Sequence, residues 1–174
     1  TYDHDAPELF SAESFSYGTH EITKNIQANG RYGAVQAEKT AQITIDADVY
    51  AVYTKGADGQ NAAMAVEAGG TSKVIIKGGD FRQVGVPADD PICDLIYATD
   101  KATIEIQGGT FKAVTPANTL NVIDSARGVA KIIVSGGSFY KYDPSHPTMG
   151  ENEVFVADGY HVVKNGDWYT VVKN

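Results

Sequence analysis

Apolar positions recur along this chain in short segments with a period of two. Five segments align, with apolar outer positions in all but the last: Ile-Thr-Ile at 43–45, Val-Ile-Ile at 74–76, Ile-Glu-Ile at 104–106, Ile-Ile-Val at 132–134 and His-Val-Val at 161–163. Successive side chains of a β-strand point to opposite faces, so this alternation predicts strands that bury one face. No stretch of roughly ten or more residues has the periodicity of an amphipathic helix.

Two more segments accompany each alternating segment at a nearly fixed separation. Upstream, short apolar runs end in a small residue at 34–37, 65–68, 95–98, 122–125 and 154–157. Downstream stands a large apolar residue, which is Val49, Phe81, Phe111, Phe139 and Trp168 in turn. The pattern predicts three short strands in each repeat, and the downstream residues are expected to be buried.

Glycine pairs separate the second and third predicted strands of three repeats. The pairs are Gly78-Gly79, Gly108-Gly109 and Gly136-Gly137, so their first members lie 30 and 28 residues apart. Glycine reaches positive φ without steric cost and allows backbones to approach closely, which suits a sharp corner between strands. A period between 20 and 50 residues is typical of a solenoid, whose units bury their apolar faces by stacking.

A fourth copy of the corner has two readings. Asn165-Gly166 precedes Trp168 as each glycine pair precedes its phenylalanine, and this register favours a coil corner. The same dipeptide is typical of a type I′ β-hairpin, which would close the end of the solenoid with two antiparallel strands.

The pattern as a whole predicts an all-β chain, a short right-handed parallel β-helix of about five coils with three strands in each coil and caps at both ends. A propeller blade needs a longer repeat of about 40 residues, whereas an antiparallel sandwich remains open. One domain is expected. Residues 1–31 are predicted to be an N-terminal cap, arm or incomplete first coil, and residues 32–174 the β-helix with its closing strands.

Composition narrows the range of partners. The net charge of −8 and the pI of about 4.8 argue against nucleic acid and anionic membranes as partners. The single cysteine, Cys93, is expected to be buried and cannot form an internal disulfide. No apolar run is long enough for membrane insertion.

Variable segments join one predicted coil to the next, and all of them follow the third strand, so we expect them to form one loop-bearing edge. Such loops on a rigid scaffold are where binding residues usually lie. The polar candidates there are Asp58, Gln60, Asn61, Asp89, Asp90, Thr115, Asn118, Asp143, His146 and Glu151. On the neighbouring strands, the column of outward positions is predicted to contain Gln36, Glu67, Tyr97, Asp124 and Val156, where Tyr97 between two acids could receive a sugar.

Catalytic and metal sites have weaker support. Stacked coils could bring Asp89 or Asp90 near Asp58 or Asp143, as a glycan-cleaving carboxylate pair requires, but the sequence selects no pair. Oxygen ligands from Asp89, Asp90 and Asp94 are conceivable for calcium, without a recognised calcium motif. The four histidines are scattered, and no metal or other cofactor is expected.

The C-terminal third carries a family likeness. Gly-Gly-Ser-Phe at 136–139, Val-Phe-Val-Ala-Asp-Gly-Tyr at 154–160 and Trp-Tyr-Thr-Val-Val at 168–172 resemble the last coils of right-handed parallel β-helix repeat proteins displayed on bacterial surfaces and on tailed-phage virions. This resemblance, over roughly residues 32–174, implies a non-enzymatic structural or binding module at a virion or cell surface. It also implies a homo-oligomer, with a trimer favoured, or attachment to a capsid or cell-wall protein, and a surface glycan as a further partner. A small polysaccharide lyase or hydrolase is the alternative.

Overall fold

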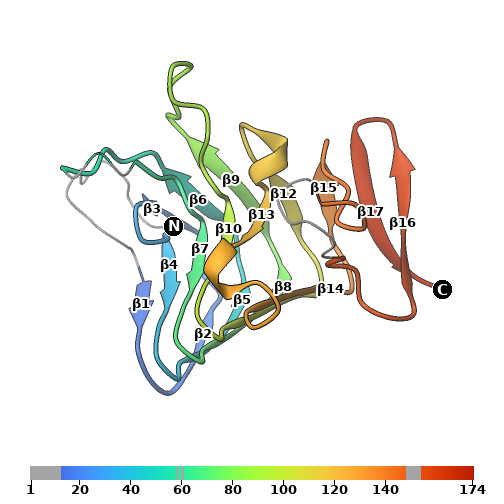
Figure 1. Cartoon of the computed structure of the whole chain (residues 1–174), viewed down its shortest axis with the longest axis horizontal. Coiled ribbons are helices and arrows are strands. Elements are labelled where there is room, and N and C mark those ends of the chain that lie inside the picture. The colour runs from blue at the N-terminus through green and yellow to red at the C-terminus, as the bar shows by residue number, and fades with distance from the viewer. Residues whose placement is uncertain (1–12, 58, 60, 148–153) are drawn as a thin grey trace.

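The chain folds into three stacked sheets of short parallel strands, as the computed structural model shows (Figure 1). The structure describes residues 13–57, 59, 61–147 and 154–174. Sheet A contains β1 (Glu13–Phe15), β4 (Val35–Ala37), β7 (Val66–Ala68), β10 (Ile96–Ala98) and β13 (Leu120–Val122). Sheet B contains β2 (Thr19–Ile22), β5 (Gln42–Asp46), β8 (Lys73–Gly78), β11 (Thr103–Ile106) and β14 (Lys131–Val134).

Sheet C carries the third strand of every repeat and, in addition, the C-terminal pair of strands. Its members are β3 (Ile26–Asn29), β6 (Val49–Val52), β9 (Asp80–Val84), β12 (Thr110–Lys112), β15 (Ser138–Tyr140), β17 (Trp168–Lys173) and β16 (Tyr160–Asn165). Each set of three consecutive strands from β1 to β15 therefore places one strand in each sheet. This arrangement confirms the predicted all-β chain of stacked parallel strands and is compatible with a solenoid.

The core lies between the three sheets. Phe81, Phe111 and Phe139 are each completely buried, and their rings stack with centroid distances of 4.9 and 4.8 Å. Stacked aromatic pairs contribute about 0.5–1.5 kcal/mol beyond the burial of their area. Parallel pairing sets this ladder in register, because Phe81 is paired with Phe111 and Phe111 with Phe139.

The glycine pairs occupy the predicted corners between sheets B and C. Gly79, Gly109 and Gly137 have φ values of +108°, +101° and +93°, which residues with a side chain rarely adopt. The first glycines of the pairs meet a further constraint. A Cβ at Gly108 would overlap the carbonyl oxygen of Lys77, and one at Gly136 would overlap that of Gln107. The second glycine of each pair thus supplies the positive φ, and Gly79, Gly108 and Gly136 all allow the backbone to stack closely on its neighbour.

The C-terminal segment differs from the favoured prediction. Asn165-Gly166 is not the corner of a further coil but lies at the turn of an antiparallel hairpin, in which β16 pairs with β17 and β17 pairs with β15. Gly166 has φ +59°, and Asn165 is paired with Trp168 across the two-residue loop. Trp168, expected in the core, lies outside it and contacts Tyr140 edge-on at 5.4 Å.

The last two upstream segments were also placed wrongly by the sequence pattern. β13 ends at Val122, which is paired with Ala98. The sequence pattern had placed Ser125 at the position equivalent to Ala98, so the strand lies three residues earlier than predicted. The residues that follow form the short 3₁₀ helix η2 (Asp124–Ala126), inside a longer turn between sheets A and B. Val156 bridges Val134 of sheet B rather than joining sheet A.

The N-terminal segment contributes more than a cap. Within residues 13–29, β1, β2 and β3 pair in parallel with β4, β5 and β6, so this part of the predicted cap is a complete three-strand set. These strands lie at one end of the stacks and the hairpin β16–β17 lies at the other (Figure 1).

Candidate functional site

The loops after β9 and β12 rise along one edge of the molecule, as expected from their common position after the third strand (Figure 1). The second of them contains the 3₁₀ helix η1 (Pro116–Asn118). Of the predicted loop residues, Asp58, Gln60 and Glu151 lie outside the described part of the chain. The others serve different purposes, which their contacts reveal.

Asp90 is the centre of a brace between two successive loops. Its Oδ2 accepts hydrogen bonds from the Tyr53 hydroxyl at 2.5 Å and from the Asn61 Nδ2 at 2.7 Å. These donors lower the pKa of Asp90, and the same contact raises the pKa of Tyr53 to about 12. Asp89 is exposed beside it. Asp90 is therefore occupied by internal donors, which gives it a loop-bracing role.

Asp94 is held in a similar way, one loop further along the stack. Its two carboxylate oxygens accept from the side-chain amides of Asn118 at 3.1 Å and Asn121 at 3.2 Å. Burial raises the pKa of Asp94, and the two amide donors oppose that rise. The carboxylate is thus desolvated yet fixed in position.

A partly buried amide that the sequence pattern did not reveal ties these loops together. Gln83, on β9, donates from Nε2 to the carbonyl of Cys93 at 2.8 Å, and its Oε1 accepts from the backbone N–H of Val114 at 2.9 Å. Cys93 itself is buried, as predicted. The loops around the candidate site are consequently cross-linked by side chains and held to the rigid sheets.

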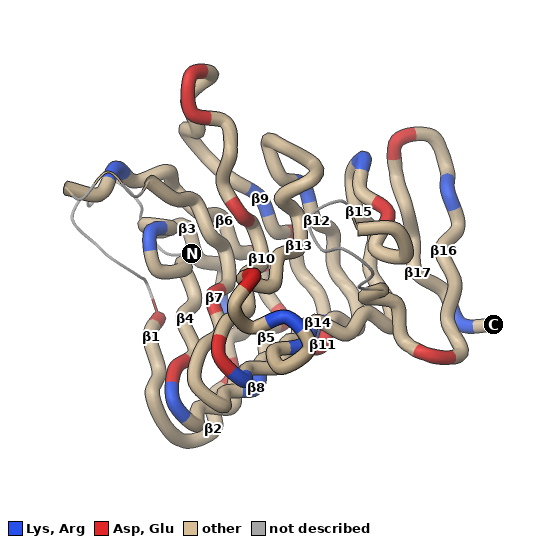
Figure 2. Tube along the Cα trace, viewed as in Figure 1, with Lys and Arg blue, Asp and Glu red and all other residues tan. Residues whose placement is uncertain are grey.

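A groove of about 270 Å³ opens over the outer face of sheet A, beside these loops. It is lined by Arg31, Tyr32, Asn61, Ala62, Met64, Glu67, Asp94 and Tyr97. Figure 2 shows acidic positions on β7 and just before β10, where Glu67 and Asp94 lie. Two desolvated carboxylates and a tyrosine ring are therefore gathered in one shallow concavity, which we call the sheet A groove.

The register of sheet A fixes the neighbours of Tyr97. Tyr97 is paired with Glu67 on one side and with Asn121 on the other, and Gln36 stands beyond Glu67. The predicted outward column was therefore correct for Gln36, Glu67 and Tyr97. It was wrong for Asp124 and Val156, because the longer turn after β13 and the bridge to sheet B remove them from sheet A.

Glu67 is the most strongly perturbed acid of the groove. Burial, followed by the nearby negative charges of Glu38 and Asp100, raises the pKa of Glu67 to about 7. Its Oε2 atom is shielded from solvent and has no hydrogen-bond partner among the described residues. Burial also raises the pKa of Tyr97, and the charges of Asp94, Glu67 and Asp124 act in the same direction. The groove thus places two partly buried acids beside an aromatic ring.

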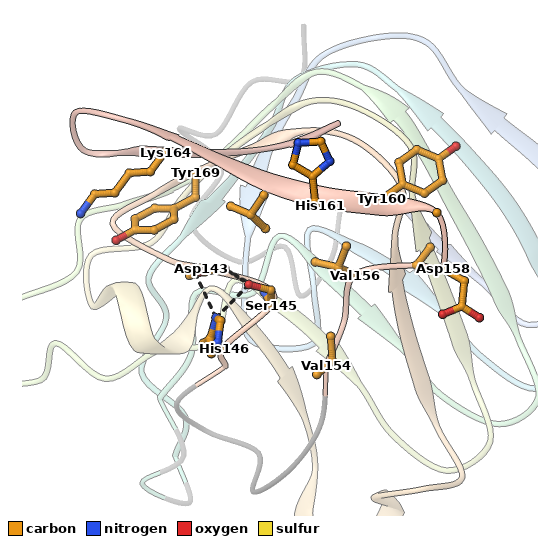
Figure 3. A pocket seen from close by; sticks show the side chains of 13 residues that line it. Asp143, Ser145, His146, Val154, Val156, Asp158, Tyr160, His161, Lys164 and Tyr169 are labelled. Carbon is orange, nitrogen blue, oxygen red and sulfur yellow. Dashed lines mark hydrogen bonds and ion pairs between the residues drawn. The ribbon is translucent and has the colours of Figure 1, made fainter. Parts of the chain in front are cut away.

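A second concavity, the C-terminal pocket, lies between the loop at 143–146 and the hairpin β16–β17, with a volume of about 570 Å³ (Figure 3). It is lined by Asp143, Ser145, His146, Val154, Val156, Ala157, Asp158, Gly159, Tyr160, His161, Val162, Lys164 and Tyr169. The predicted binding residues Asp143 and His146 meet here, far along the stack from Asn61 and Asp90.

Asp143, Ser145 and His146 form a local turn rather than a catalytic triad. The Ser145 hydroxyl bonds Asp143 Oδ1 at 2.6 Å and His146 Nδ1 at 2.9 Å, and the same Nδ1 lies 3.3 Å from Asp143 Oδ2 (Figure 3). In a triad the hydroxyl and the carboxylate use opposite ring nitrogens. Here both use Nδ1, so Asp143 does not orient His146 as a base for the Ser145 hydroxyl in the way that a triad requires.

Within the described residues, no group of three or more His, Cys, Asp or Glu side chains is arranged to hold a metal ion. No helix in the described part of the chain is long and apolar enough to span a membrane. Comparisons of this chain with protein-family models, with curated proteins and with solved structures find no match. The sheet A groove and the C-terminal pocket are therefore the candidate functional sites.

Proposed function

We propose that this chain is a short right-handed parallel β-helix of five coils that acts as a non-enzymatic binding module on a phage virion or bacterial surface, where it binds glycan in the sheet A groove. The observation that carries the proposal is the placement of Tyr97 between Glu67 and Asn121 in register, with Asp94 in the same groove. A ring supplies an apolar face, and carboxylates and amides supply hydrogen-bonding groups, which together suit an amphipathic sugar.

The rigidity of the scaffold supports this role. Tyr97 and Glu67 lie on parallel strands whose inner faces are completely buried, and the adjoining loops are braced by Asp90 and Gln83. A site whose side chains are already ordered loses little conformational entropy when it binds. The acidic surface of the chain keeps such a displayed module soluble.

A glycan array followed by titration calorimetry tests the proposal. The wild-type chain is compared with Tyr97→Ala, and with Tyr17→Ala as a control at an exposed tyrosine on the turn after β1. We expect at least a tenfold loss of affinity in Tyr97→Ala and none in Tyr17→Ala. Absence of glycan binding by the wild-type chain, or equal losses in both variants, would contradict the proposal.

Display on a virion or cell wall also leads us to propose a homo-oligomer, with a trimer favoured. The support is that β13 ends sheet A with no further strand of the described chain beside it. Exposed sheet edges favour pairing with another chain. Light scattering coupled to size exclusion measures the state directly, and a strictly monomeric chain at micromolar concentration would remove this part of the proposal.

One observation favours a second candidate, a small polysaccharide-active lyase or hydrolase. Glu67, with a pKa of about 7, has the proton affinity of a general acid at neutral pH, and Asp94 provides a second carboxylate in the same groove. In this candidate Glu67 and Asp94 take the place of Asp89 and Asp90. Release of reducing or unsaturated ends from a polysaccharide panel, abolished in Glu67→Gln, is the required result. Bound glycan that remains uncleaved excludes it.

A further inference from the structure

The C-terminal pocket combines an apolar floor with a polar rim. Val154, Val156 and Val162 contribute apolar surface, and the rings of Tyr160 and Tyr169 flank it (Figure 3). Around them stand acidic, basic and hydroxyl side chains. A volume of about 570 Å³ lies in the range of small-ligand sites, which are mostly apolar with a few convergent polar groups. A ligand with an apolar face and polar edges, such as a pyranose ring, fits this distribution.

The positive charge of Lys164 indicates that the ligand of this pocket carries a negative group. Its ammonium lies 5.1 Å from the centroid of the Tyr169 ring, and no carboxylate of the described residues is within ion-pairing distance. The ring holds the ammonium in place through a cation–π contact. Lys164 and Tyr169 are cross-strand partners on β16 and β17, so the hairpin register sets this geometry.

The acid on the loop side of the pocket, Asp143, is already engaged by internal hydrogen bonds. Asp143 accepts from the backbone N–H of Ser145 at 2.9 Å, from its hydroxyl, and faces His146. Asp158 lies near Tyr160, at the opposite end of the pocket from Lys164 (Figure 3). Lys164 and Tyr169 therefore form the end of the pocket that is suited to a negative group.

We propose that the C-terminal pocket is a second ligand site, separate from the sheet A groove, which takes a sugar unit bearing a carboxylate. The sugar ring packs against Tyr169 and the valine floor, and the carboxylate pairs with the Lys164 ammonium. The hairpin consequently has two roles, because it both covers the last parallel strand of sheet C and forms one wall of the site.

An NMR titration of the full ¹⁵N-labelled chain tests this proposal with three probes at equal ionic strength. Glucuronate carries both the ring and the carboxylate, glucose has the ring alone, and acetate has the carboxylate alone. We expect glucuronate to bind at least fivefold more tightly than either control and to shift the amides of Val162, Lys164 and Tyr169. Equal affinities for glucuronate and glucose, equal affinities for glucuronate and acetate, or shifts confined to other parts of the chain overturn the proposal.

Variants separate the site from a general effect of positive charge. Lys164→Met keeps the apolar stem but removes the ammonium, so its affinities for glucuronate and glucose should become equal. Lys112→Met is the matched control, because the Lys112 ammonium lies 4.5 Å from the Tyr140 ring centroid and Lys112 does not line the C-terminal pocket. Lys112→Met should keep the preference for glucuronate over glucose.

Tyr97→Ala should also keep this preference, so failure of the groove proposal and failure of this one are distinguishable. Preference retained in Lys164→Met overturns the assignment.

Discussion

Glu67 lies directly opposite Tyr97 on the neighbouring parallel strands β7 and β10, and both side chains project from the outer face of sheet A. The pairing places an acid with a pKa of about 7 beside an aromatic ring, on a surface that the completely buried Val66, Ala68, Ile96 and Ala98 hold rigid from the other side. Burial is the main cause of the raised pKa, so protonation of Glu67 is coupled to folding.

This coupling predicts a pH-dependent stability. Glu67 has a folded pKa of about 7, whereas an unfolded glutamate has one of about 4.3, so the folded state binds the extra proton between these values. The stabilising effect of the bound proton is complete below the unfolded pKa and is lost as pH rises through 7. We expect Glu67→Gln to be more stable than wild type by about 1–3 kcal/mol at pH 8, with little difference at pH 4.5.

Urea unfolding at both pH values measures the difference, and Glu21→Gln provides the control because Glu21 is an exposed glutamate on β2. Its effect on the free energy of unfolding should be small and independent of pH. An effect of Glu67→Gln that is the same at pH 4.5 and pH 8 would show that burial does not couple this proton to folding.

The middle ring of the phenylalanine stack is expected to contribute most to the stability of the core. Phe111 lies between Phe81 and Phe139 with no exposed surface, so Phe111→Ala leaves a cavity and removes two stacked contacts. The expected loss is about 3–5 kcal/mol in the free energy of unfolding, measured by urea denaturation. The control Lys112→Ala changes the adjacent exposed residue and should cost less than about 1 kcal/mol. Comparable losses in the two variants would mean that the stack is not the stabilising feature.

The sequence pattern was sufficient for the middle of the fold and insufficient for its ends. From β4 to β12 the alternation is regular, and from β7 to β12 the glycine corners and the phenylalanines agree with it, so the strands could be placed correctly. After β13 the turn around Asp124 contains extra residues, so the spacing between the segments changes. The sequence alignment matched Val122–Ser125 to the earlier segments by residue type and therefore placed the strand too late. At the C-terminus, Asn165-Gly166 satisfies both a coil corner and a hairpin, and the pairing of β17 with β15 decides between them.

The candidate site was only partly predictable for a related reason. The outward positions Glu67 and Tyr97 follow from strand alternation, but Asp94 precedes β10 in a loop, and its place in the groove depends on Asn118 and Asn121. Asp90 appeared to be an available acid in the sequence because its donors, Tyr53 and Asn61, lie 37 and 29 residues away. Contacts at such separations depend on the stacking of the loops, which the spacing of strands does not specify.

The glycine corners yield a prediction that separates close packing from backbone conformation. Gly108 does not have positive φ, but a Cβ there would overlap the carbonyl oxygen of Lys77 on the neighbouring strand. Gly108→Ala must therefore displace one stacked backbone from the other, with an expected loss of about 1–3 kcal/mol or more. Gly85→Ala is the matched control, since Gly85 has φ +72° but open space around it. The thermal midpoint should fall further for Gly108→Ala, and the reverse order would mean that conformation outweighs stacking.

The turn of the hairpin β16–β17 controls how firmly the end of sheet C is covered. Gly166 adopts φ +59° with no atom near its missing Cβ, so a substitution there meets only backbone strain. A β-branched residue is strongly disfavoured at positive φ, whereas asparagine tolerates it. We expect Gly166→Val to weaken the hairpin by about 1–3 kcal/mol and Gly166→Asn by much less. Amide hydrogen exchange of β16 and β17 measures the effect locally.

Because β17 covers the edge of β15, Gly166→Val should also accelerate exchange at the outer edge of β15 and increase aggregation, as expected when a strand edge is uncovered. Unchanged exchange in β15 despite a loosened hairpin would mean that β17 does not protect this end of sheet C.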